Sequence, residues 1–142
     1  LWAQLEESGR ITRSRVEAWG YYHELLEHAE RKGVLRRPIV PQDCGHNGHM
    51  YYVLLDDSSN RDQVIRILKD QLINVLFHYV PLHDSPAGLR FARSHGPMPH
   101  SEALSRRLLR LPLWVGITQG QQERIVGELL DAIKNSTNVF SG

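Results

Sequence analysis

The chain has 142 residues, 41% hydrophobic and 23% charged, which is typical of one folded domain and argues against global disorder. Its 17 basic and 16 acidic residues are scattered and leave a formal net charge of +1. The chain therefore has no stripe of basic residues that would indicate a nucleic-acid partner. No apolar run approaches the roughly 20 residues that span a bilayer, no signal-peptide pattern opens the chain, and the single Cys44 excludes an internal disulfide, so we expect a cytoplasmic protein without a membrane partner.

The first expected element is a long amphipathic helix from Leu1 to about Lys32. Its apolar stripe recurs at helical spacing and consists of Leu5, Thr12, Val16, Trp19, Tyr22, Leu26 and Ala29. Gly33 is the expected end, and Gly9 is the expected position of a kink or break. Because no capping residue precedes the helix, we interpret the chain as a piece of a longer protein, with Leu1, Trp2 and Leu5 forming an exposed apolar patch.

The middle of the chain predicts alternating strands and helices. After an irregular connection at 36–47, a strand is expected at 50–55, then a helix capped by Asn60 or Ser59 with the stripe Val64, Ile65, Leu68, Leu72 and Ile73. A second strand is expected at 75–80, and Pro81 ends it because proline cannot donate to a ladder.

The last third predicts two more helices and a third strand. Ser101 caps a short helix through Arg107, residues 111–115 form a strand, and Thr118 with Gln121 forms a capping box for the last helix. The polar tail from Asn135 is expected to be loosely ordered. These elements predict an α/β fold in which helices pack on a short sheet and the leading helix docks elsewhere.

The chain contains eight histidines, which raises the question of a metal site. His46 and His49 are three residues apart, but closed zinc sites usually add cysteines or carboxylates, and Cys44 is the only thiol. We therefore expect no bound metal. The alternative requires His46, His49 and an acidic residue to converge within coordination distance.

A second group of polar aromatic residues occupies 78–83, where a buried strand is expected to run into a loop fixed by Pro81. Functional sites concentrate at such strand ends. In a regular strand, His78 and Tyr79 would point in opposite directions. From the residues alone, Tyr79 can equally be an aromatic at the edge of the core with its hydroxyl in water.

The chain offers three lysines for covalent chemistry, Lys32, Lys69 and Lys134, and all are expected to be solvated. A lysine that forms a Schiff base needs a desolvated or cation-flanked setting. No glycine-rich phosphate loop is present either. The residues alone therefore predict a globular domain without a complete active site, which binds no cofactor by itself.

Four segments of the chain are informative when taken in order. They are Leu-Trp-Ala-Gln-Leu-Glu at 1–6, Gly-His-Met-Tyr-Tyr at 48–52, Phe-His-Tyr-Val-Pro-Leu-His at 77–83 with Pro-Ala-Gly at 86–88, and Ser-Arg-Arg-Leu-Leu-Arg-Leu-Pro-Leu at 105–113. In this order they resemble the DegT/DnrJ/EryC1/StrS sugar aminotransferases. The ordered set is specific, whereas any one segment is not.

The resemblance implies the C-terminal small domain of a fold-type-I transferase dependent on pyridoxal phosphate (PLP), with a short antiparallel sheet covered by helices. Residues 1–33 would form the interdomain helix and residues 34–142 the small domain. An N-terminal PLP-binding domain before Leu1 would carry the Schiff-base lysine. The family also implies a homodimer with active sites at the subunit interface.

The resemblance further implies a reaction and a set of contacts. Glutamate would donate an amino group, through PLP, to C4 of a dTDP-linked 4-keto-6-deoxyhexose. His78, Tyr79 and His83 are the first candidates for contact with the sugar nucleotide, and Asn47 and His49 come second. No catalytic residue is expected in this chain. The alternative is a non-catalytic homologue or a stand-alone interaction or assembly domain.

Overall fold

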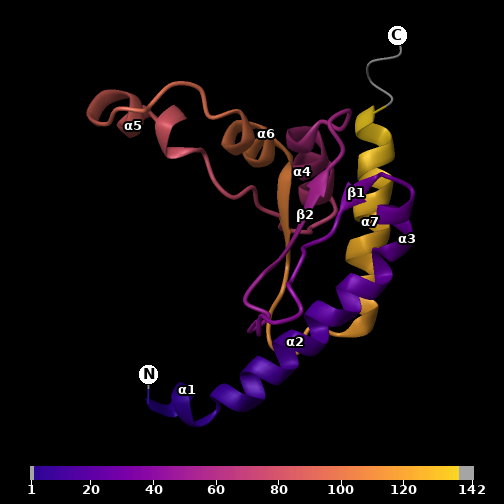
Figure 1. Cartoon of the computed structure of the whole chain (residues 1–142). Helices are drawn as coiled ribbons and strands as arrows, with labels where there is room; N and C mark the ends of the chain where they lie inside the picture. The colour runs from indigo at the N-terminus through magenta and orange to yellow at the C-terminus, as the bar shows by residue number, and fades with distance from the viewer. Residues whose placement is uncertain (1, 138–142) are drawn as a thin grey trace.

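The computed structural model describes residues 2–137 as a small antiparallel sheet packed against helices (Figure 1). The helices are α1 (Trp2–Glu6), α2 (Ser8–Leu25), α3 (Glu27–Arg31), α4 (Arg61–Asp70), the 3₁₀ turn η1 (Leu82–Asp84), α5 (Pro86–Phe91), α6 (Pro99–Arg107) and α7 (Gln119–Thr137). The strands are β1 (Leu35–Arg36), β2 (Tyr51–Leu55) and β3 (Leu108–Leu111). The predicted α/β fold with a short antiparallel sheet is confirmed. Within the described residues, no helix is long and apolar enough to cross a membrane.

The leading helix is divided into α1, α2 and α3, so the prediction of one continuous helix was wrong. The interruptions lie at Glu7 and Leu26, where ψ is 0° and −2°, while Gly9 lies inside α2. Gly33 follows α3 with φ of +73°, a conformation that favours glycine, and the predicted end is confirmed. Trp2 and Leu5 are exposed as expected. Leu1 lies outside the described residues.

The sheet has β2 at its centre, antiparallel to β1 and to β3. The predicted strand at 50–55 is confirmed as β2. The prediction of a strand at 75–80 was wrong, because only Leu76 pairs, in an isolated bridge with Arg110. The third strand ends at Leu111, where it was predicted to begin, because the next residue, Pro112, has no N–H to continue a ladder.

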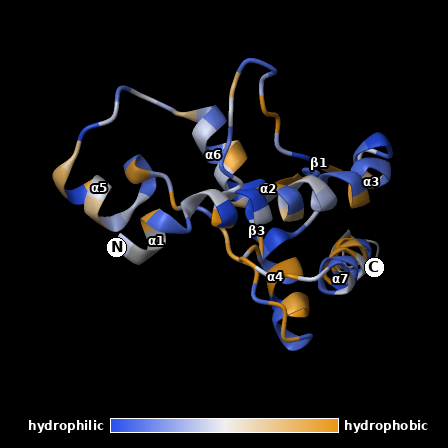
Figure 2. Ribbon diagram, turned by 90° about the horizontal axis from the view of Figure 1, so that it is seen from below, coloured by the Kyte–Doolittle hydropathy of each residue, from blue (hydrophilic) through white to orange (hydrophobic). Residues whose placement is uncertain are grey.

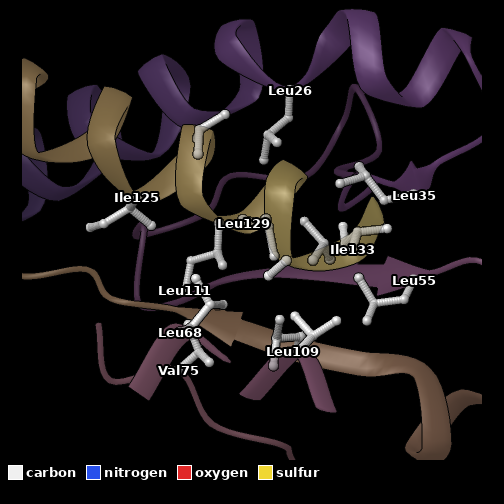
Figure 3. Packing of buried hydrophobic residues seen from close by; sticks show 14 of the residues in the cluster. Leu26, Leu35, Leu55, Leu68, Val75, Leu109, Leu111, Ile125, Leu129 and Ile133 are labelled. Carbon is white, nitrogen blue, oxygen red and sulfur yellow. The ribbon is translucent and has the colours of Figure 1, made fainter. Parts of the chain in front are cut away.

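The hydrophobic core lies between one face of the sheet and α7. Side chains alternate along a strand, and the buried ones on this face are Tyr51, Val53, Leu55, Leu109 and Leu111. Figure 3 shows Leu129 and Ile133 of α7 above the two strands and Leu26 on the other side of α7, so here α7 lies between Leu26 and the sheet. Both α2 and α4 contact α7.

Two predicted helix starts are confirmed by their hydrogen bonds. Asn60 caps α4, because its side chain accepts a hydrogen bond from the Gln63 amide at 3.1 Å. Before α7, the Gln121 amide donates to Thr118 Oγ1 at 3.2 Å and the Thr118 amide donates to Gln121 Oε1 at 2.9 Å, which is a capping box. These caps fix where each helix begins.

Three local predictions near helix ends were wrong. Leu72 lies beyond the end of α4, with φ of 60° and 92% exposure, and therefore does not continue the buried stripe. Ser101 does not cap α6, which begins at Pro99 after Met98. Asn135 and Ser136 belong to α7, so the tail is helical as far as Thr137, and residues 138–142 lie outside the described part.

An arm with η1 and α5 leaves the sheet after Leu76 and returns through α6. Figures 1 and 2 both place α5 and α1 far from α7. The arm is rich in exposed apolar side chains: Phe77, Tyr79, Val80, Leu82, Leu89, Phe91, Met98 and Leu104. Helix α5 was not predicted, because its six residues are too few to show a period.

Candidate functional site

The segment that carries His78 and Tyr79 is fixed to the sheet at its start. Leu76 and Arg110 exchange two backbone hydrogen bonds, of 3.2 and 2.7 Å. The next residue, Phe77, lies beneath the Arg61 guanidinium, whose carbon is 5.2 Å from the ring centroid. Arg61 also donates to the Ser105 carbonyl oxygen, so one arginine joins α4, α6 and the segment.

His78 and Tyr79 line one hollow on the surface. The hollow has a volume of about 510 Å³ and is lined by His78, Tyr79, Val80, Pro81, Leu82, Ser101, Leu104, Ser105 and Leu108. Tyr79 is 69% exposed and also borders a second hollow of about 680 Å³, beside Arg61, Arg66 and Arg106. Because the segment is not a regular strand, the predicted alternation of His78 and Tyr79 does not apply. Both residues border the same hollow, and their side chains carry groups that can donate and accept hydrogen bonds.

His78 has a pKa below its ordinary value. Partial burial is the largest cause, and the positive charges of Arg110 and His49 lower the pKa further. His49 therefore lies within electrostatic range of His78, and the fold brings together two of the predicted residues from distant segments. A neutral imidazole carries one donor and one acceptor, which suits hydroxyl and phosphate oxygens.

The loop before β2, which carries Asn47 and His49, meets α2 through His46 and Gly48. His46 packs on Trp19 with ring centroids 4.6 Å apart, and its Nδ1 accepts a hydrogen bond from the Gly48 amide at 3.3 Å. Asn47 Oδ1 accepts from the His49 amide at 3.0 Å, so this amide oxygen serves a local turn. The loop geometry therefore positions His49, while Asn47 acts within the loop.

His83 faces a different environment from His78. Its Nε2 lies 3.3 Å from Glu102 Oε1 of α6, and its side chain is 15% exposed. It borders a neighbouring hollow of about 760 Å³ on the other side of Pro81 and Leu82. The pair ties η1 to α6, so the observed contact of His83 is structural.

The described residues do not fit a PLP site. Lys32, Lys69 and Lys134 are all exposed, as predicted, and none lines the hollows around Tyr79. A desolvated lysine that could hold PLP covalently is therefore not among them. Over residues 2–137, no three histidine, cysteine or acidic side chains gather closely enough to hold a metal ion.

Sequence reasoning missed four arginines at this site. Arg61, Arg66 and Arg106 border the hollow beside Tyr79, and Arg110 lies within electrostatic range of His78. One signal was available for Arg110, because it alternates with the buried Leu109 and Leu111 and must point to the opposite face of the sheet. The other three line the hollow because of how α4 meets α6, which no local pattern indicates.

Comparison with known proteins gives consistent matches along the chain. The sequence profile of the DegT/DnrJ/EryC1/StrS aminotransferase family matches residues 1–130. A dTDP-4-dehydro-2,3,6-trideoxy-D-glucose 4-aminotransferase of Saccharopolyspora spinosa is 28% identical over 133 residues, which are 93% of this chain and 32% of that protein. A pleiotropic regulatory protein of Geobacillus stearothermophilus is 25% identical over 86% of this chain and 32% of its own length.

Solved structures agree with the sequence matches. The aminotransferase TlmJ of Streptoalloteichus hindustanus superposes with a TM-score of 0.77 at 25% identity, covering 94% of this chain and 34% of TlmJ. A putative sugar aminotransferase of Streptococcus pneumoniae, in its apo-form, has a TM-score of 0.88 at 15% identity over 99% of this chain and 35% of its own, which shows the shared fold. This chain spans about a third of the length of these relatives. With most of its length matched by the family profile, the chain belongs to the DegT/DnrJ/EryC1/StrS aminotransferase family.

Proposed function

We propose that this chain is the C-terminal part of a PLP-dependent sugar-nucleotide aminotransferase. Residues 1–33 would form the connection to a PLP-binding domain, and residues 34–142 the small domain. The observation that carries the proposal is the hollow in which His78 and Tyr79 present polar groups together, with His49 nearby. The relatives named as sugar aminotransferases support the same reaction class.

The proposed reaction transfers an amino group from glutamate to C4 of a dTDP-4-keto-6-deoxyhexose. The product that we propose is dTDP-4-amino-4,6-dideoxygalactose, a precursor for polysaccharide biosynthesis. PLP would carry the amino group between donor and acceptor, and the lysine that holds PLP would lie in the N-terminal domain. The enzyme would act as a cytoplasmic homodimer.

The roles of this chain's residues follow from their surroundings. The exposed Tyr79 hydroxyl can donate to or accept from a sugar or phosphate oxygen, and a neutral His78 can do the same. Pro81 fixes the direction in which the chain leaves the site. We propose His78 and Tyr79 as the substrate-contacting residues. His49 would support them, Asn47 would shape the loop, and His83 would contact substrate only if it leaves Glu102.

One observation favours a second candidate function, that of an interaction or assembly domain. The arm after Leu76 exposes many apolar side chains, and a regulatory protein is among the relatives.

The deciding experiment incubates the full-length protein with PLP, glutamate and dTDP-4-keto-6-deoxyglucose. Mass spectrometry should detect an amino sugar nucleotide and 2-oxoglutarate in equal amounts. Bound PLP without either product would refute the proposed activity and favour the interaction domain.

A second measurement concerns this chain alone. With its lysines exposed on helices or at helix ends, the 142-residue chain should form no stoichiometric pyridoxyl adduct after borohydride reduction at low PLP concentration. An adduct at a single lysine would show a cofactor site within this chain. It would contradict the proposal that the lysine that holds PLP lies in the N-terminal domain.

A further inference from the structure

The face of the sheet opposite the core is open around Arg110. In the antiparallel register, Arg110 lies opposite Tyr52 on one side and pairs with Leu76 on the other. Side chains of directly opposed residues point to the same face, so these three share the face that the core does not use. Leu76 is 51% exposed, which shows that α7 does not cover this face. At the other end of this face of the sheet, α6 contacts β2, and Leu54 of β2 is buried.

Arg110 lacks a polar partner for its side chain in this position. Its Nε is buried and its N–H donates to no hydrogen-bond acceptor, and no ion pair to Arg110 occurs among residues 2–137. Two other arginines of this region do have acidic partners: Arg61 pairs with Asp62 and Arg107 with Asp57. A buried guanidinium nitrogen without an acceptor is costly, because it has lost its hydration without replacement.

The neighbours of Arg110 include two imidazoles and offer it no ion pair. Arg110 and His49 both lower the pKa of His78, so they lie within electrostatic range of that imidazole. The three residues arrive from β3, from the loop before β2 and from the segment after Leu76, so the fold gathers them from separate parts of the chain. A guanidinium without an ion pair in a partly desolvated place creates a positive potential that an anion would relieve.

We propose that Arg110 is the oxyanion-binding group of this site, with His78 and His49 beside it. A guanidinium presents a planar fork of donors that matches two oxygens of a phosphate or a carboxylate. The ligand chemistry is thus an oxyanion, either the diphosphate of a sugar nucleotide or a carboxylate of the amino donor. The inference deepens the proposed function by naming the residue that recognises charge, and its binding test is independent of transamination.

The test follows the imidazole of His78 by NMR in the 142-residue chain, titrated separately with inorganic pyrophosphate and with glutamate. A bound anion raises the pKa of a neighbouring histidine, so pyrophosphate should raise the pKa of His78. Arg110→Gln should weaken the binding about ten-fold to a hundred-fold, and Arg110→Lys less, because lysine keeps the charge but loses the fork. Without ligand, Arg110→Gln should itself raise the pKa of His78, since a positive neighbour is removed. The matched control is Arg31→Gln, which removes an exposed arginine of α3.

The outcomes separate the ligand sources. A shift with pyrophosphate alone assigns the site to the phosphates, and one with glutamate alone assigns it to the donor carboxylate; both support the inference when they depend on Arg110. No shift with either anion, or equal shifts in the native chain and in Arg110→Gln or Arg110→Lys, would overturn it. Transamination by the full-length protein with unchanged kinetics in Arg110→Gln would overturn the inference and leave the proposed function standing.

Discussion

A methyl group added at Gly48 tests whether the loop that holds His49 is fixed by its contact with α2. Gly48 is buried with φ of +58°, and a Cβ there would lie 2.7 Å from the Arg15 carbonyl carbon and 2.8 Å from the Val16 nitrogen. Those atoms are helix backbone and cannot rotate away. Gly48→Ala must therefore lift the loop from α2 or distort the helix.

The magnitude follows from two separate costs. The left-handed backbone costs an alanine about 1 to 2 kcal/mol, and forced overpacking typically adds about 1 to 3 kcal/mol. Gly33→Ala is the matched control, because Gly33 has φ of +73° but no atom within 4 Å of its Cβ position, so only the first cost applies.

Urea unfolding of both variants, with NMR of the His49 and His78 rings, checks this prediction. Gly48→Ala should lower the free energy of unfolding about 1 to 3 kcal/mol more than Gly33→Ala does. It should also move the His49 resonances, since the loop shifts. Equal losses in the two variants with unmoved His49 signals would refute the idea that α2 clamps the loop.

The remaining predictions concern the core, a cap and pH. Leu129→Ala removes a fully buried side chain of α7 and should cost about 2 to 5 kcal/mol by urea unfolding; a loss below about 1 kcal/mol would contradict the packing. Asn60→Ala should lower the free energy of unfolding by about 1 kcal/mol, whereas Ser59→Ala should lower it little, because Ser59 makes no capping hydrogen bond. Equal losses in the two variants would show that Asn60 is not the cap. Burial, then the charge of Arg37, lowers the pKa of His23 below 6.5, so its neutral form favours the fold: stability is full above pH 6.5 and falls as pH drops through the lowered pKa. His23→Gln should flatten that loss in unfolding measured across this range, and an unchanged pH profile would count against it.

The accuracy of sequence reasoning followed how local each interaction is. The caps at Asn60 and Thr118 were predictable, because a capping side chain bonds the backbone of its own first turn. The segment at 75–80 has the composition of a strand, yet it pairs with β3 only through Leu76 before it departs into the arm. Whether an apolar segment pairs with another strand depends on tertiary structure, which the sequence of the segment alone does not indicate.

The candidate site shows the same division. His78, Tyr79 and His49 could be named through the resemblance, and the fold places His49 within electrostatic range of His78. The alternation along β3 could place Arg110 on the face opposite the core, but its lack of an ion pair could not be predicted, because that requires the positions of all its neighbours. His83 had the same standing as His78 in the motif, but its contact with Glu102 gives it a structural place.

The most direct test of the central claim measures the two half-reactions of the full-length enzyme separately in Tyr79→Phe and His78→Ala, with Tyr21→Phe and His28→Ala as controls far from the hollow. Loss of one substrate hydrogen bond should lower the specificity constant for the sugar nucleotide about two-fold to a hundred-fold. The half-reaction with glutamate and the bound PLP should remain unchanged, because the contacts proposed for Tyr79 and His78 are with the sugar nucleotide. Equal losses in both half-reactions, or loss of PLP, would show that these residues support the fold or the cofactor and would contradict their proposed contact with the sugar nucleotide.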